Sequence, residues 1–130
     1  MVLVLAWDTI NHCQSAEIGE AIACLEGLKL ANANSNANLI IETDCAAVID
    51  AFRETSCNRS EVHLIAKEFS LLKHSDRQVN ITKVARSCNM VAHNLCQLSR
   101  SVLCGGVLQG AVPTCASKSA LNDCNNYIVS

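Results

Sequence analysis

Two carboxylates are the residues in this chain whose types and positions are best suited to chemistry. Glu20 lies in a helical stretch of small and apolar residues, 19–28, and Asp44 ends the short apolar run 39–44. A carboxylate at the carboxyl end of a strand, facing a carboxylate on a neighbouring helix, can bind a divalent cation for phosphodiester chemistry. The pair therefore predicts a metal-dependent site that acts on nucleic acid.

Each carboxylate also has a simpler interpretation. Asp44 stands directly before a helical pattern that starts at Cys45, where its side chain could accept backbone N–H groups as a helix cap. Glu20 could be a solvated residue on a helix surface, since charged helix faces usually meet solvent. Capping and cation binding can coexist at Asp44.

Charge is unevenly distributed along the chain. Residues 1–76 hold eleven Asp and Glu against five Lys and Arg, a balance of −6, whereas residues 77–130 hold one acid against five, a balance of +4. The stretch without acids contains Arg77, Lys83, Arg86 and Arg100. This asymmetry predicts that one surface meets an anion such as phosphate while another collects metal; the alternative is ordinary surface variation.

Composition limits the class of protein. A chain of 130 residues suits one domain, and 50% apolar residues favour a globular core over disorder. Aromatic residues make up 3%, which argues against a platform for stacking single-stranded bases. The nine cysteines form no CxxC pair, which argues against a zinc ribbon. Their odd number and the absence of a signal-peptide pattern favour a reducing, intracellular setting. The apolar opening, 1–7, is too short to span a bilayer.

Hydrophobic periodicity predicts an alternation of strands and helices. We expect strands over 2–7, 38–43 and 78–85, and helices over 16–33, 45–55, 60–74 and 88–103, with N-caps at Ser15 and Ser60. The strand over 38–43 is apolar enough to predict a buried, parallel position.

This order predicts an α/β layered fold with a mixed sheet flanked by helices. Three strands make a thin sheet for so many helices, and we therefore expect the fold to be truncated at its N-terminus. Gly105 and Gly106 should end the last helix. We assign 1–104 to the domain and 105–130, where the pattern is weak, to a C-terminal tail.

Four segments together resemble the ribonuclease H-like domain of plant proteins, a relative of the ribonuclease H domains of reverse transcriptases. They are the Glu-Ala-x-Ala-x-x-x-Gly-Leu pattern over 20–28, the Leu-Ile-Ile-Glu-Thr-Asp-Cys run over 39–45, the segment 84–93, and a degenerate tail with Pro113 and Asp123. The segment 84–93 is similar to that family's Val-Pro-Arg-x-x-Asn-x-x-Ala-His. Each motif alone is weak, but three of them follow one another in the family's order.

The resemblance implies hydrolysis of the RNA strand of RNA–DNA hybrids with two Mg²⁺ or Mn²⁺ ions held by a carboxylate cluster. It implies catalytic, metal-binding roles for Glu20 and Asp44, with Glu17 a competing choice for the helix carboxylate. It places His93 where bacterial relatives carry a fourth carboxylate, so we include it among the catalytic candidates. A structural histidine is the alternative, because imidazole suits magnesium badly.

Three polar side chains around the junction of the third expected strand and the last expected helix are candidates for nucleic-acid contacts. Lys83, Arg86 and Asn89 are expected to contact phosphate. Arg86 and Asn89 could equally fix the loop between strand and helix through hydrogen bonds to the backbone.

Departures from the family pattern predict weak or absent activity. The family's first strand carries an Asp that has no counterpart here, since Asp8 follows what resembles the family's third strand. Lys83 replaces a His and Ala85 replaces the Pro of the family motif. Two alternatives to a hybrid ribonuclease stay open: a non-catalytic nucleic-acid-binding module, and a residual gene fragment with a poorly cooperative fold.

Overall fold

The computed structural model describes residues 4–7, 14–54, 59–102 and 105–109. In chain order, the elements are β1 (Val4–Trp7), α1 (Ala16–Asn34), β2 (Leu39–Thr43), α2 (Ala46–Arg53), α3 (Glu61–Leu72), β3 (Val79–Lys83), the 3₁₀ turn η1 (Arg86–Cys88), α4 (Met90–Val102) and β4 (Gly106–Gln109). The predicted alternation of strands and helices is confirmed, and with it the α/β class.

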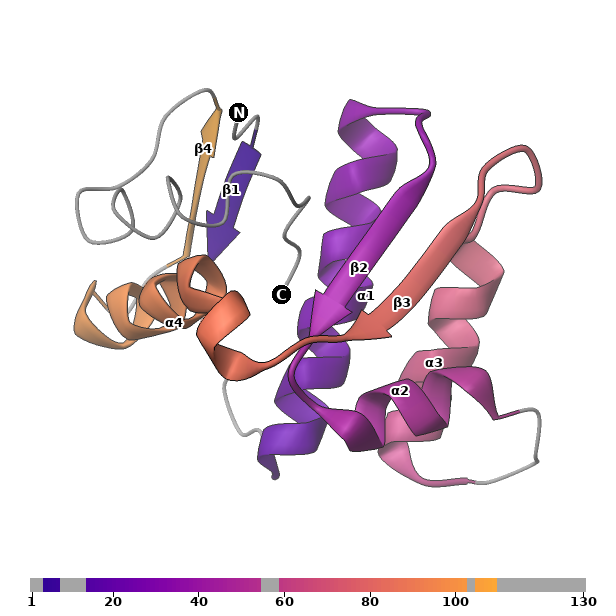
Figure 1. Ribbon diagram of the computed structural model, residues 1–130, viewed down its shortest axis with the longest axis horizontal. Helices are drawn as coiled ribbons and strands as arrows, with labels where there is room; N and C mark the ends of the chain where they lie inside the picture. Colours follow the sequence, from indigo (N-terminus) through magenta and orange to yellow (C-terminus); the bar gives the residue numbers. More distant parts are fainter. Residues whose placement is uncertain (1–3, 8–13, 55–58, 103–104, 110–130) are drawn as a thin grey trace.

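The described strands form two small sheets (Figure 1). β2 and β3 pair in parallel, with Leu39 opposite Val79 and Thr43 opposite Lys83, which confirms the parallel position predicted for the second strand. β1 and β4 pair antiparallel, with Val4 opposite Gln109. α4 packs against β1, so the second sheet and the last helix form a group of their own beside the first sheet.

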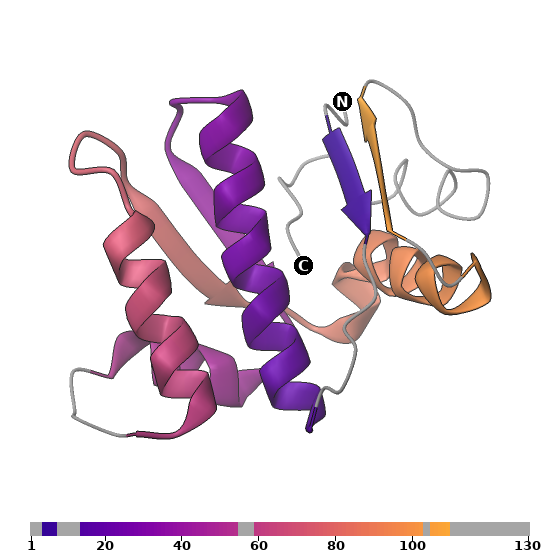
Figure 2. The same cartoon turned by 180° about the vertical axis from the view of Figure 1, so that it is seen from behind.

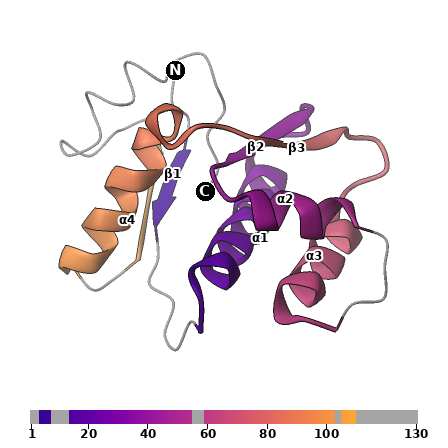
Figure 3. The same ribbon diagram turned by 60° about the horizontal axis from the view of Figure 1, so that its bottom comes forward.

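Helices cover one face of the β2–β3 sheet. Seen from behind, α1 and α3 lie across this sheet (Figure 2), and a tilted view places α1, α2 and α3 on the same side of it (Figure 3). Ser15 and Ser60 begin α1 and α3 as predicted, because each side-chain oxygen accepts a hydrogen bond from the backbone N–H three residues on, at 3.3 and 3.4 Å.

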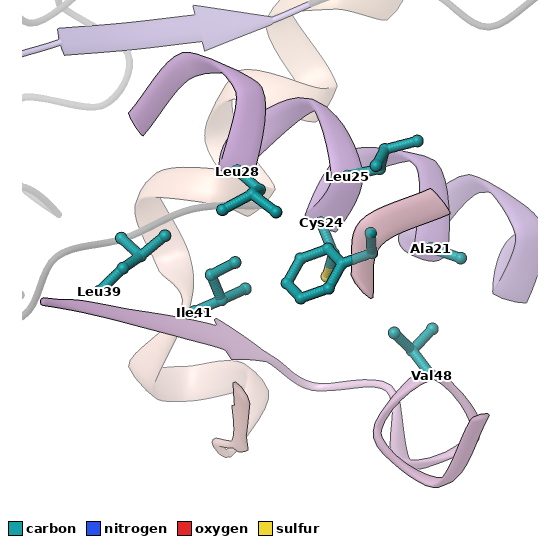
Figure 4. Close-up of a cluster of buried hydrophobic side chains, with 8 residues drawn as sticks. Ala21, Cys24, Leu25, Leu28, Leu39, Ile41 and Val48 are labelled. Carbon is teal, nitrogen blue, oxygen red and sulfur yellow. The ribbon is translucent and has the colours of Figure 1, made fainter. Parts of the chain in front are cut away.

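The core lies between this sheet and its helices. Leu28 and Cys24 of α1 point toward Ile41 of β2 (Figure 4). The buried cluster consists of Ala21, Cys24, Leu25, Leu28, Leu39, Ile41, Val48 and Phe69. Small side chains on α1 let the helix approach the sheet closely, and each large apolar side chain that is fully buried contributes about 1.5–3 kcal/mol.

Three local expectations need correction. Residues 106–109 form β4, although their pattern predicted no regular structure. The last helix begins at Met90, because η1 takes up 86–88. Ile40, in the run predicted to be buried, is 48% exposed, because it lies on the face of β2 opposite α1.

Some expectations fall outside the described residues or are untested. Residues 1–3, Asp8, Pro113 and Asp123 lie outside the described ranges. The expected N-terminal truncation stays a prediction. Within the residues that the structure describes, no helix is long and apolar enough to cross a membrane.

Candidate functional site

The parallel pairing of β2 and β3 brings two distant segments to one edge of the sheet. The strands end together at Thr43 and Lys83, and the backbone N–H of Val84 donates to the carbonyl oxygen of Thr43 at 2.9 Å. Parallel strands have their carboxyl ends at the same edge, where α/β proteins commonly bind ligands. Asp44 and Arg86 therefore emerge side by side, although 42 positions separate them.

Thr43 connects this edge to α1. Its buried hydroxyl donates to Oε2 of Glu20 at 3.4 Å, and its oxygen accepts a hydrogen bond from the backbone N–H of Cys45 at 3.2 Å. The N-cap of α2 is Cys45, not Asp44. The alternative of Asp44 as a helix cap is therefore wrong, because Asp44 lies one position before the cap and its carboxylate is directed to Arg86 instead.

Glu20, Asp44, Lys83 and Arg86 all line one open cavity of about 500 Å³. The complete lining is Ala16, Glu17, Glu20, Asp44, Cys45, Lys83, Val84, Ala85 and Arg86. Four of the six predicted site residues thus meet, two of them acidic and two basic. Glu17, the competing choice for the helix carboxylate, lines the same cavity.

The two carboxylates interact electrostatically. Burial raises the pKa of Glu20 above its ordinary value of 4.5, and the negative charge of Asp44 raises it further. The hydrogen bond from Thr43 and the charge of Arg86 act in the opposite direction on this pKa. Arg86 Nε also donates to Asp44 Oδ2 at 3.1 Å. A positive charge in this cavity therefore relieves repulsion between Glu20 and Asp44.

Glu20 and Asp44 carry the type of side chain that could hold a hydrated divalent cation. Magnesium is commonly held by one or two carboxylates, with water and substrate phosphate completing its shell. Glu20 and Asp44 supply two carboxylates that already repel each other at this strand edge. Within the described residues, no group of three or more His, Cys, Asp or Glu side chains could hold a metal ion together.

The structure places His93 away from this cavity. His93 is half-buried on α4, with its Nε2 atom 3.2 Å from Nε2 of Gln97. Its backbone N–H donates to the carbonyl oxygen of Asn89 at 3.2 Å. His93 is not among the residues that line the cavity, so its position favours the structural role.

The sequence left two roles open for both Asn89 and Arg86: contact with phosphate, and fixing the loop between strand and helix. The structure shows different environments for the two residues. Asn89 is 6% exposed, and its backbone N–H donates to the carbonyl oxygen of Arg86 at 3.0 Å. The side-chain oxygen Oδ1 of Asn89 is buried without a hydrogen-bond partner among the described residues, so the bond that fixes the loop is made by the backbone of Asn89. The Arg86 side chain is 76% exposed, which favours contact with an external anion.

Sequence reasoning missed two residues that matter here. Thr43 joins Glu20 to the strand end, and the available signal was a polar residue inside a buried apolar strand. Arg77 was counted among the surface cations, but it is buried. Its Nη1 donates to Oδ1 of Asn32 at 2.9 Å and to the carbonyl oxygen of Ser35 at 3.0 Å. Arg77 therefore stabilises the end of α1.

A comparison with protein families gave one match. The model of a family described as reverse transcriptase-like matches residues 1–99. No curated protein and no solved structure matched the chain. The matched range contains every residue that lines the cavity.

Proposed function

Because the chain belongs to the reverse transcriptase-like family, a ribonuclease H-like family, we propose that it binds an RNA–DNA hybrid at the cavity between α1 and the strand ends. Glu20 and Asp44 would hold one Mg²⁺ or Mn²⁺ ion at this place, and hydrolysis of the RNA strand is weak. The observation that carries the proposal is the meeting of Glu20, Asp44, Lys83 and Arg86 in one cavity.

The residues of the cavity have separate tasks. Glu20 and Asp44 provide negative charge at the strand edge, where a bound divalent cation would supply Lewis-acid stabilisation of phosphate oxygens. Lys83 and Arg86 provide positive charge on the same wall and can bind the phosphates of the backbone. Thr43 holds Glu20 in place through its hydroxyl.

The expectation that hydrolysis is weak rests on the small number of carboxylate ligands in the cavity. Two-metal hydrolysis needs ligands that hold both ions about 3.5–4 Å apart. Glu17 lines the same cavity, but within the described residues no group of three or more His, Cys, Asp or Glu side chains could hold a metal ion together, so Glu20 and Asp44 are the two ligands that we propose. The same observation favours a second candidate function, a module that binds nucleic acid and does not cleave it.

A cleavage assay separates these two functions. A labelled RNA–DNA hybrid is incubated with the protein and Mg²⁺ or Mn²⁺, and the products are compared with those of Glu20→Gln and Asp44→Asn. We expect slow turnover that both variants abolish. Absence of any turnover in the wild type favours the binding module, whereas fast turnover that either variant abolishes would contradict weak hydrolysis.

A binding assay tests the phosphate contacts. The affinity of the wild type for the hybrid is measured against salt concentration, with Lys83→Gln as the variant and Arg59→Gln, at an exposed position outside the cavity, as the control. Two neutralised phosphates predict a slope of log affinity against log salt of about −2, and Lys83→Gln should reduce it by about 1. A flat response would exclude both functions.

A further inference from the structure

Arg86 already supplies positive charge where a cation would bind Asp44. Its Nε atom lies 3.1 Å from Asp44 Oδ2, and it lines the same cavity as Glu20. The Asp44 carboxylate is largely sheltered, at 21% exposure, whereas the Arg86 side chain is 76% exposed. A sheltered acid is therefore neutralised by a cation whose side chain is mostly in solvent.

We propose that Arg86 is a displaceable counter-ion, which leaves Asp44 when a divalent cation binds and then contacts a phosphate of the nucleic acid. This inference deepens the proposed function and rests on it. The exchange makes cation binding and phosphate binding support each other. A divalent cation would neutralise the Asp44 carboxylate in place of Arg86. The released guanidinium would then pair with a phosphate of the nucleic acid.

The backbone around Arg86 is fixed while its side chain is free to move. Arg86 begins η1, in which the N–H of Cys88 donates to the carbonyl oxygen of Ala85 at 2.8 Å. Asn89 donates to the carbonyl oxygen of Arg86 and is itself buried. The guanidinium can therefore turn from Asp44 toward the cavity mouth by rotation about side-chain bonds, without a loop movement.

The ion pair is weak enough to be exchanged. Because the Arg86 side chain is 76% exposed, solvent screens this pair, and solvent-screened pairs contribute at most a factor of about 5 to an equilibrium. A divalent cation that touches both Glu20 and Asp44 interacts with two negative charges. Guanidinium also binds phosphate in a fork geometry that a single Nε contact to Asp44 does not use.

Lys83 provides the matched comparison. It lines the same cavity and carries the same charge, but the ion pair with Asp44 is made by Arg86. A general effect of cavity charge on cation binding would therefore be similar for the two residues. Displacement from Asp44 would be specific to Arg86.

Calorimetric titration with Mn²⁺ tests the exchange. We expect Arg86→Gln to bind Mn²⁺ about two- to five-fold more tightly than the wild type, because no side chain competes for Asp44. Lys83→Gln should give a smaller gain, and Arg59→Gln should leave the affinity unchanged. In the double variant Asp44→Asn/Arg86→Gln, the gain should disappear. A gain in Arg86→Gln no larger than that in Lys83→Gln would overturn the proposal.

A second titration tests the coupling itself. A saturating short RNA–DNA hybrid should tighten Mn²⁺ binding to the wild type and should do so much less for Arg86→Gln. Equal tightening in both proteins would refute the exchange. If the wild type binds no Mn²⁺, the proposed cation site fails and the exchange fails with it. If Asp44→Asn abolishes Mn²⁺ binding while Arg86→Gln matches the wild type, only the exchange fails.

Discussion

Replacing Asn32 with alanine should destabilise the protein more than its position near a helix end suggests. The Asn32 side chain uses both ends of its amide. Its oxygen accepts a hydrogen bond from buried Arg77 at 2.9 Å, and its nitrogen donates to the carbonyl oxygen of Leu72 at 3.1 Å. Asn32 therefore joins the end of α1 to the end of α3 and to the loop before β3.

The cost can be worked from these two contacts. A hydrogen bond to a charged group contributes about 1.5–3 kcal/mol, and a neutral one about 0.5–1.5 kcal/mol. Alanine has a higher helix propensity than asparagine, and this adds up to about 0.7 kcal/mol to the free energy of unfolding. Asn32→Ala should therefore lower the free energy of unfolding by about 1.3–3.8 kcal/mol.

Asn34→Ala is the matched control. Asn34 lies at the same end of α1, and its exposed side chain donates only to the carbonyl oxygen of Leu30 within the helix, at 2.8 Å. The propensity gain is the same, so this variant should change the free energy of unfolding by less than about 0.5 kcal/mol. Urea unfolding followed by circular dichroism measures both. Equal losses in the two variants would refute the reasoning, and a single sharp transition in the wild type would count against a residual gene fragment.

Three further predictions concern the core, the site and the thiols. Phe69→Ala should lower the free energy of unfolding by about 3–5 kcal/mol in urea, because Phe69 is buried in the core; a loss below about 1 kcal/mol would contradict this. Because the folded-state pKa of Glu20 is raised, the wild type should lose stability as pH rises from 4.5 through that pKa; Glu20→Gln should be the more stable protein at neutral pH, with no advantage below 4.5. Burial raises the pKa of Cys24 to about 12, so a thiol reagent followed by mass spectrometry should label exposed Cys88 and Cys96 long before Cys24.

The sequence predicts the parts of the site that depend on local pattern. Glu20 lies in a stretch where several apolar residues recur at helical spacing, and Asp44 follows an apolar strand whose composition predicts parallel pairing. These two facts place one carboxylate on a helix and the other at a strand end, and the expectation that both lie at one edge of a sheet rests also on the resemblance to the family. The contact between Asp44 and Arg86 depends in addition on strand register and on the turn η1, and neither is encoded by hydrophobic periodicity.

The missed features depend on partners distant in the chain. The four residues of β4 have no pattern that distinguishes them from a loop, and they become a strand through pairing with β1. Arg77 resembles any surface cation in the sequence, and its burial follows from Asn32, which lies 45 positions earlier. Side-chain hydrogen bonds across such separations have no local signature.

The pairing of β1 with β4 sets an order of events during synthesis. Val4 pairs with Gln109, 109 − 4 = 105 positions later, whereas Leu39 pairs with Val79 after 79 − 39 = 40 positions. At roughly 5–20 residues per second, β1 leaves the ribosome about 5–20 s before its partner strand exists. The part of the chain that carries Glu20, Asp44 and Arg86 can therefore fold on the nascent chain before β4 is available to pair with β1.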